Sequence, residues 1–169
     1  AAKTHILLKK KNKNIITIII PRHINRVKQI IAEIKKLGLN VVSRSSKKLK
    51  LKGIDIFIVD TFGETKKFYK FATTVFLGKS IIKGGGQNPL EPARFGAKIL
   101  HGPDVNNFKD VYKYLRKLKI SSVVNSPQKC ADSIIFKKNM KKVQKMKYLG
   151  STILKKTLNE LDKSIHNEI

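Results

Sequence analysis

The sequence predicts an α/β fold in which a parallel sheet is covered by helices on both faces. Short apolar, β-branched runs recur along the chain, and the clearest of them lies at residues 15–20. A continuous apolar run is typical of a central parallel strand that is buried on both sides. Between these runs, apolar residues recur at helical spacing, as they do at residues 27–37. Strands that alternate with helices imply right-handed crossovers and therefore a parallel, doubly wound sheet.

The same patterns locate the individual elements. Strands are predicted at residues 15–20, 39–42, 54–59, 74–77, 98–100 and 122–124. Helices are predicted at residues 3–11, 27–37, 64–72, 89–95 and 108–118, and from Pro127 to the end of the chain with a break at Gly150. We expect Gly38 to end its helix, and we expect Phe68 and Phe71 to point inward.

Length and composition limit the possible classes of protein. A chain of 169 residues can bury one core, so we expect one domain over residues 1–150 and a separate helix at 151–169. The single cysteine, Cys130, excludes an intramolecular disulfide and a multi-cysteine metal site. No apolar run approaches the roughly 18 residues of a membrane span, and we expect a soluble domain without a signal peptide.

The charge of the chain is strongly positive, because 37 basic residues face 11 acidic ones and give a net charge of +26. Such an excess attracts polyanions, either nucleic acid or an anionic membrane surface. The lysines are scattered rather than gathered into one motif, and Lys, Ile and Asn are abundant throughout, as in an A/T-rich coding sequence. Either compositional drift or a functional role would explain this charge.

Three polar segments each follow directly after a predicted strand. They contain Pro21, Arg22 and His23; Thr61, Phe62, Gly63 and Glu64; and the stretch GGGQNPLE at residues 84–91. In parallel α/β sheets, ligands bind beyond the carboxyl ends of the strands. The chain order therefore predicts that the three segments meet at one edge of the sheet and form a binding site.

The glycine-rich segment has the chemistry of an anion site. Gly85 and Gly86 allow close backbone approach and positive φ. Asn88 suits a helix N-cap, and the prolines that follow suit the first helical turn. Free N–H groups and the positive end of the helix dipole favour a phosphate there, and the Glu91 carboxylate can accept hydrogen bonds from sugar hydroxyls.

The exact strings carry a family resemblance. GGGQNPLEPARFGAKILHGPDVNNF resembles the segment GGHNPLEPAALGKPVLFGPHxxNF of the 3-deoxy-D-manno-octulosonic acid (Kdo) transferases. IIIPRHINR and VDTFGE resemble the PRHPER and DTMGE segments of that family, in the same order. The resemblance implies a Rossmann-like domain, the carboxyl-terminal half of a two-domain B-type glycosyltransferase, which binds CMP-Kdo. It also implies a last helix, at residues 151–169, that packs across the interdomain cleft.

The resemblance implies roles for the loop residues. Arg22, after Pro21, would stabilise the phosphate of the CMP leaving group, and His23 would bind phosphate or brace the loop. Backbone groups at Thr61 and Gly63 would read the cytosine edge. Phe62, which replaces the usual methionine, would either stack on the base or fill the core, and we favour the core.

The remaining predicted binding residues are Glu64, Gly85, Gly86, Asn88 and Glu91. Glu91 would hold the ribose hydroxyls, whereas Glu64 and Asn88 also suit simple helix caps. The sequence departs from the family at Gln87, where histidine is usual, and at Lys79, where glycine is usual.

The resemblance places the rest of the enzyme outside this chain. The amino-terminal domain would carry the membrane anchor, the acceptor site for a lipid A precursor and the general base, so no catalytic base is predicted here. The histidines are dispersed and no Asp-x-Asp element occurs, so we expect metal-independent transfer without a cofactor. The intact protein would act in lipopolysaccharide biosynthesis at the cytoplasmic face of the inner membrane, beside anionic lipid, and this half would be inactive alone.

Two other functions compete with this one. A basic nucleic-acid-binding module fits the charge and the scattered tyrosines Tyr69, Tyr112 and Tyr114, but no zinc, KH, RRM or OB pattern is present, so we expect no nucleic acid as partner. A degenerate fragment that folds without function is the other alternative.

Overall fold

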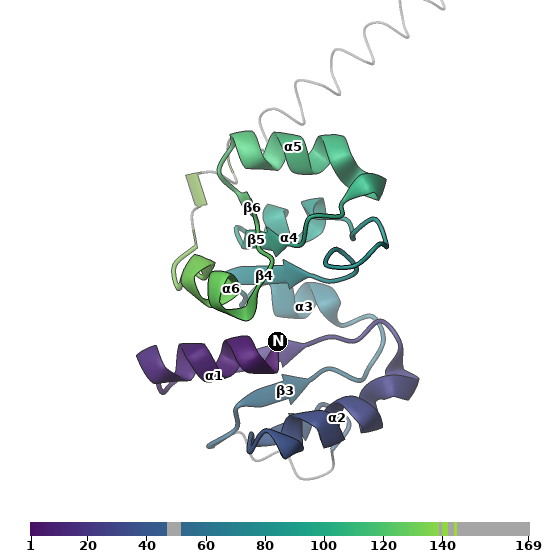
Figure 1. The fold of residues 1–169 in the computed structure, drawn as a ribbon, viewed down its shortest axis with the longest axis vertical. Coiled ribbons are helices and arrows are strands. Elements are labelled where there is room, and N and C mark those ends of the chain that lie inside the picture. The colour runs from purple at the N-terminus through teal and green to yellow at the C-terminus, as the bar shows by residue number, and fades with distance from the viewer. Residues whose placement is uncertain (47–51, 139, 142–143, 145–169) are drawn as a thin grey trace, which may run out of the picture. The chain divides into compact units, whose positions relative to one another are not determined.

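The computed structural model describes residues 1–46, 52–138, 140, 141 and 144. The helices along the chain are α1 (Ala2–Lys11), α2 (Val27–Lys36), α3 (Thr65–Tyr69), α4 (Leu90–Arg94), α5 (Lys109–Lys117) and α6 (Pro127–Ser133), with 3-10 turns η1 (Ile24–Arg26) and η2 (Asn106–Phe108). The strands are β1 (Thr17–Ile19), β2 (Val41–Ser43), β3 (Ile56–Ile58), β4 (Thr74–Leu77), β5 (Lys98–His101) and β6 (Ser121–Val123). Strands and helices alternate along most of the described chain, except that β3 follows β2 with no described helix between them (Figure 1).

The described residues divide into two compact units. Unit 1 comprises Ala1–Phe71 and Val123–Ile134, and unit 2 comprises Ala72–Ser122 and the described residues from Ile135 onward. Each unit holds one three-stranded sheet, and the recorded pairings β1–β3, β2–β3 and β4–β5 are all parallel. The predicted α/β class, with parallel strands and helices on both sides of a sheet, is confirmed.

In unit 1, β3 is the central strand. The strand order is β1-β3-β2, and all three residues of β3 are buried. Because side chains alternate across a strand, Ile56 and Ile58 pack with α2, whereas Phe57 on the other face contacts Phe68 of α3 with ring centroids 6.1 Å apart. The prediction that residues 15–20 form a central strand is wrong within this unit, since β1 is an edge strand and Ile18 is 38% exposed.

Helix α1 of unit 1 packs against α6. The Thr4 hydroxyl donates to the Pro127 carbonyl at 3.4 Å, and Lys11 forms an ion pair with Asp132 at 2.9 Å. A buried histidine, His5, follows Thr4 in α1 and points toward the sheet, where its Nδ1 lies 2.9 Å from the Thr17 hydroxyl. The amino-terminal helix is therefore an integral part of unit 1.

In unit 2 the strand order is β4-β5-β6. The core joins Leu77 and Ile99 from the sheet to Tyr112 and Leu115, which α5 contributes at helical spacing. At the amino end of β4, the Thr74 hydroxyl exchanges hydrogen bonds of 3.0 Å with the backbone of Ile135. This contact ties the segment after α6 to the sheet.

Three expectations about individual segments need correction or fall outside the description. Phe71 is 79% exposed rather than inward, because α3 ends at Tyr69, one turn earlier than predicted. The helix from Pro127 ends at Ser133, where Ile134 turns extended with ψ 136°. Gly150 and residues 151–169 lie outside the described residues.

Candidate functional site

The predicted site residues of unit 1 lie in two segments that follow neighbouring strands at one edge of its sheet. Strands β1 and β3 run parallel with Ile19 opposite Ile58. The segment of Pro21, Arg22 and His23 follows β1, and the segment from Thr61 to Glu64 follows β3. Both segments therefore start from the carboxyl ends of neighbouring strands, as the chain order predicts. The meeting of these two segments with the glycine-rich segment of unit 2 stays a prediction.

Arg22 is exposed and makes no hydrogen bond or ion pair with another residue that the structure describes. Pro21 before it is half-buried, and His23 after it is exposed and precedes the 3-10 turn η1. An unpaired guanidinium has all its N–H donors available for an oxyanion. The structure thus leaves Arg22 free for the predicted phosphate contact.

Phe62 lies on the surface, with 83% of its side chain exposed. The interpretation of Phe62 as a core residue is therefore wrong. Gly63 next to it has φ 76°, a left-handed conformation that glycine adopts without steric cost. The turn projects Phe62 away from the sheet, and the ring is available for stacking.

Glu64 is held by side chains from three segments. Its carboxylate accepts a hydrogen bond from the Thr61 hydroxyl, and it pairs with Lys67 at 3.3 Å and with Arg44 at 3.4 Å. The Thr61 hydroxyl, followed by Lys67 and Arg44, holds the pKa of the Glu64 carboxyl below its usual range. Glu64 is thus an ionised acceptor that fixes Arg44 at this edge, and its side chain makes no cap bond to α3.

Arg44 is a residue of this edge that the sequence analysis missed. It follows β2, whose carboxyl end lies beside that of β3 with Ser43 opposite Ile58. The next residue, Ser45, donates its backbone N–H to Asp60 at 2.9 Å and its hydroxyl to the same carboxylate. Arg44 directly follows a strand, and this position was the signal that could have identified it.

In unit 2 the glycine-rich segment is held by Asp104. The Asp104 carboxylate accepts the backbone N–H groups of Gly84 at 2.7 Å and Gly85 at 2.9 Å, and the Gly86 N–H donates to the Lys79 carbonyl at 2.8 Å. The hydrogen bond from Gly85, then that from Gly84, lowers the pKa of the Asp104 carboxyl. These glycine N–H groups are therefore already paired within the protein.

Close packing explains the glycines instead. Gly85 and Gly86 have φ 74° and 71°, and a Cβ on Gly85 would stand 2.4 Å from the Asn107 side chain. The segments after β4 and β5 interlock at Ser80, which is fully buried and whose hydroxyl accepts the Gly102 N–H at 2.8 Å. The two segments pack closely against each other, because neither backbone has space for a side chain at these contacts.

Asn88 and Glu91 lie where the glycine-rich segment leads into α4. The Asn88 side-chain oxygen accepts the Leu90 N–H at 3.0 Å, so the capping interaction is present one residue before the helix boundary at Pro89. The buried Tyr112 hydroxyl donates to the Gln87 carbonyl at 2.9 Å. Glu91 is in the first turn of α4 and is half-buried.

No group of three or more His, Cys, Asp or Glu side chains is arranged to hold a metal ion within the described part of the chain. In the same residues, no helix combines the length and apolarity that crossing a membrane requires.

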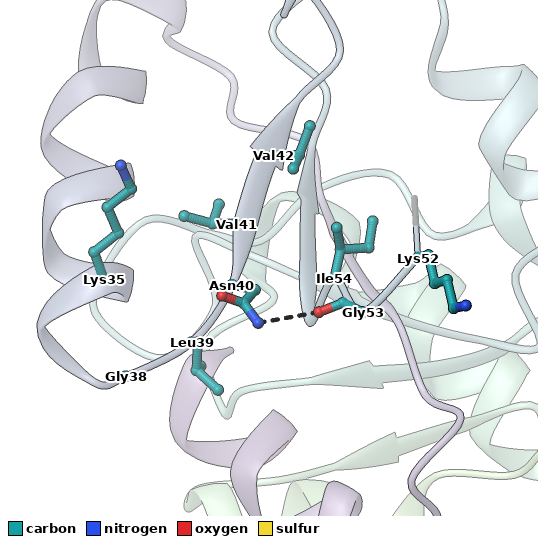
Figure 2. A pocket seen from close by; sticks show the side chains of 9 residues that line it. All are labelled: Lys35, Gly38, Leu39, Asn40, Val41, Val42, Lys52, Gly53 and Ile54. Carbon is teal, nitrogen blue, oxygen red and sulfur yellow. Dashed lines mark hydrogen bonds between the residues drawn. The ribbon is translucent and has the colours of Figure 1, made fainter. Parts of the chain in front are cut away.

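A hollow of about 640 Å³ in unit 1 lies away from the predicted site. It is lined by residues 38–42 and 52–54 together with Lys35, and Figure 2 shows the Asn40 side chain reaching the Gly53 carbonyl at 3.1 Å. These residues stand at the amino ends of β2 and β3. Ligands of parallel sheets bind at the opposite ends, and we assign the hollow no role.

Comparison with known proteins gives consistent relatives. The chain is 44% identical over 96 residues to the 3-deoxy-D-manno-octulosonic acid transferase of Rickettsia felis, covering 57% of this chain and 20% of that protein. It is 26% identical over 137 residues to the enzyme of the same name from Haemophilus influenzae, covering 79% of this chain and 32% of the relative. No protein-family model matches the chain.

The fold has a counterpart among solved structures. The crystal structure of the C-terminal CMP-Kdo binding domain of WaaA from Acinetobacter baumannii superposes with a TM-score of 0.71 at 22% identity, covering 77% of this chain and 68% of that one. This likeness concerns the fold.

Parallel α/β units whose polar loops leave the carboxyl ends of their strands form the class of fold that binds nucleotides at that edge. Within that class, the chain is similar to the Kdo transferases. It spans only 20% and 32% of the length of the two curated relatives above.

Proposed function

We propose that this chain is the donor-binding half of a Kdo transferase and that it binds CMP-Kdo through the loops at its strand ends. The observation that carries the proposal is Arg22, an exposed arginine without a partner among the described residues, at the carboxyl end of β1. The neighbouring loop after β3 presents Phe62, an exposed aromatic ring. A cation and an aromatic face are the groups that a cytidine monophosphate needs.

Arg22 would act on the leaving group. When the bond between the sugar and the phosphate oxygen breaks, negative charge grows on the phosphate of CMP. A guanidinium can donate two parallel N–H bonds to phosphate oxygens. Donors that are in place before the charge develops lower the barrier electrostatically. Arg22 therefore stabilises CMP as it departs, and His23 beside it is available for a second phosphate contact.

The cytosine would bind at the turn after β3. Phe62 offers a face for stacking, and base–aromatic stacking contributes about 1–3 kcal/mol per base. The Thr61 hydroxyl is already used on Glu64, so the cytosine edge falls to backbone groups near Gly63. Glu64 itself holds Arg44 and shapes this loop rather than contacting the base.

The ribose and the sugar donor would bind unit 2. Glu91 stands in the first turn of α4, where its carboxylate is suited to accept hydrogen bonds from the ribose hydroxyls. Gly85 and Gly86 contribute shape, because their N–H groups are paired within the protein. Asn88 contributes by fixing the start of α4.

The acceptor reaction needs groups from outside this chain. A general base must stand within hydrogen-bond reach of the attacking hydroxyl, and we place it in the part of the relatives that this chain does not cover. The acceptor is proposed to be a lipid A precursor at the cytoplasmic face of the inner membrane. Transfer is proposed to be metal-independent, so activity of the completed enzyme should persist in EDTA.

The nucleic-acid alternative loses one of its supports. Tyr112 is fully buried, and Tyr69 and Tyr114 are half-buried, so these rings form no stacking platform. The fragment without function is distinguished by ligand binding.

Calorimetric titration tests the proposal. CMP should bind the chain saturably, more tightly than AMP does, with loss of affinity in Arg22→Ala. Equal weak binding of all nucleotides, removed by moderate salt, would instead support a general basic surface. Absence of binding at every CMP concentration tried would support the inert fragment.

A further inference from the structure

We propose that the loop after β4 is a lipid-contacting element, in which Ile81 and Ile82 enter an anionic membrane surface while Lys79 and Lys83 bind its headgroups. The inference deepens the proposed function, on which its lipid partner rests.

The two isoleucines are adjacent in the chain, and both are exposed to solvent. Ile81 is 58% exposed and Ile82 is 74% exposed. Isolated exposed apolar side chains are common, but adjacent large ones that stay in solvent point to an interaction surface. Lys79 and Lys83 on either side of the pair are both exposed. An apolar tip between two ammonium groups matches an anionic lipid surface, where acyl chains lie beneath negative headgroups.

The loop is anchored on both sides of its tip, so the exposure does not come from a loose segment. Before the tip, the Ser80 hydroxyl donates to the Leu77 carbonyl at 2.7 Å, and the Ser80 carbonyl accepts the Asp104 N–H at 2.9 Å. After the tip, the Gly84 N–H binds the Asp104 carboxylate. The backbone between these anchors holds both isoleucines outward.

The charge of the tip favours an anionic partner. Lys79 has φ 60°, a left-handed conformation in which any residue other than glycine is strained, so an ammonium group stands where glycine would fit best. The Asp104 carboxylate interacts with Lys83, but it already accepts two backbone N–H groups. The stretch from Lys79 to Lys83 contains no acidic residue.

The position of Ile81 and Ile82 relates the lipid contact to the proposed donor site. Gly85, which belongs to the proposed donor site, follows Ile82 by three residues in the same anchored loop. An acceptor that resides in a membrane must reach the donor from the lipid side. A loop that touches lipid at one end and shapes the donor site at the other places the two substrates close together.

Co-sedimentation of the whole chain with vesicles tests the inference. Binding to mixed phosphatidylcholine–phosphatidylglycerol vesicles should exceed binding to phosphatidylcholine alone. The double variant Ile81→Ser/Ile82→Ser, whose charge is unchanged, should lower the affinity about tenfold. Lys79→Gln/Lys83→Gln should lower it by a similar factor. Lys113→Gln/Lys117→Gln, which removes two exposed lysines of α5, is the matched control and should lower it only about threefold.

A fluorescence experiment separates insertion from simple charge attraction. The chain contains no tryptophan, so Ile82→Trp supplies a single reporter, and Phe136→Trp, at a side chain of unit 2 that is 59% exposed, supplies the control. A blue shift on mixed vesicles for Ile82→Trp, absent for Phe136→Trp, supports insertion. Equal behaviour of the two reporters, or wild-type affinity in the double isoleucine variant, overturns the inference. The inference is also overturned if Lys79→Gln/Lys83→Gln and Lys113→Gln/Lys117→Gln lose vesicle affinity equally and lose duplex DNA affinity equally. A general attraction to polyanions would explain that result.

The CMP affinity of Ile81→Ser/Ile82→Ser separates this inference from the proposed function. Unchanged CMP affinity with reduced vesicle binding supports both. Vesicle binding that depends on the isoleucines, in a chain that never binds CMP, would support the lipid contact and remove the proposed function.

Discussion

The Asp104 carboxylate accepts the backbone N–H of Gly85 across 2.9 Å, and this contact joins the segments that follow β4 and β5. A side chain of the second segment thereby fixes the conformation of the glycine-rich first segment. The same carboxylate oxygen accepts the Gly84 N–H at 2.7 Å. The donor site proposed for unit 2 therefore depends on a residue outside the set predicted to bind the donor.

Asp104→Ala should loosen this segment, lower the denaturation midpoint and weaken CMP binding. Asp104→Asn should restore part of both losses, because an amide oxygen still accepts N–H groups while the charge is absent. Thermal unfolding and CMP titration of the two variants measure the effects. If Asp104→Ala binds CMP like the wild type, the glycine segment is not part of the donor site.

Gly102→Ala should destabilise unit 2 strongly. A Cβ at this position would stand 2.1 Å from the Ser80 carbonyl oxygen, so backbone atoms must move. We expect a loss of about 3 kcal/mol in the free energy of unfolding. Gly78→Ala is the control, since its Cβ would meet no atom within 4 Å, and it should change stability by less than about 1 kcal/mol. Urea denaturation measures both, and similar values for the two variants would refute the interlocked arrangement.

Arg22→Ala should weaken CMP binding without altering stability. Loss of charge-assisted hydrogen bonds corresponds to an affinity loss of about tenfold or more, whereas an exposed residue without partners affects folding by about 0.5 kcal/mol at most. Arg22→Lys should recover only part of the affinity, because an ammonium cannot form the paired bonds. Lys28→Ala removes an exposed charge from α2 and controls for general electrostatics; an equal effect in Lys28→Ala would contradict a specific phosphate contact.

Phe62 and Phe68 should respond to alanine substitution in opposite ways. Phe62→Ala should leave stability within about 0.5 kcal/mol and lower CMP affinity about fivefold or more through lost stacking. Phe68→Ala should cost about 2 kcal/mol of stability, because Phe68 packs on Phe57 in the core of unit 1. Denaturation and CMP titration on the pair measure both effects. A clear stability loss in Phe62→Ala would show that the Phe62 ring packs against the protein.

The fold should lose stability as the pH falls below about 6.5. Burial, only partly offset by the Asp55 carboxylate, lowers the pKa of His5, and burial also lowers the pKa of His101. The unfolded chain therefore binds protons that the folded chain resists, so this contribution is complete above the unfolded pKa and declines toward the folded value. His5→Gln should flatten the slope of unfolding free energy against pH in this range. An unchanged slope in His5→Gln would show that folding does not lower the pKa of His5.

The sequence predicted most elements well, and the apolar residues recur at clear helical spacing in α2 and α5. Strand β4 and helices α1 and α2 lie within one or two residues of their predicted ends. The central role of β3 was missed, since residues 15–20 carry the longer apolar run, yet strand order depends on pairing between distant segments. No local pattern encodes that pairing.

The meeting of the predicted loop segments in one site stays a prediction, and several hydrogen bonds within these segments could not be predicted from the local sequence. The segments after β1 and β3 begin within three residues of their strand ends, whereas Gly84 follows Leu77, the last residue of β4, by seven residues. The use of the glycine N–H groups was missed, because their partner Asp104 lies about twenty residues further on and reaches them only through the pairing of β4 with β5. For Phe62 the core was favoured over stacking on the base, because the residue type alone does not distinguish the two. The residue is 83% exposed, next to Gly63 at φ 76°.

A CMP titration followed by backbone amide NMR shifts tests the central claim most directly. The account predicts saturable shifts gathered around three neighbourhoods, those of Arg22, Gly63 and Asn88, with a common dissociation constant. Shifts that are absent, that appear around only one of these residues, or that spread over the lysine-bearing helices would contradict a single cytidylate site formed by these loops.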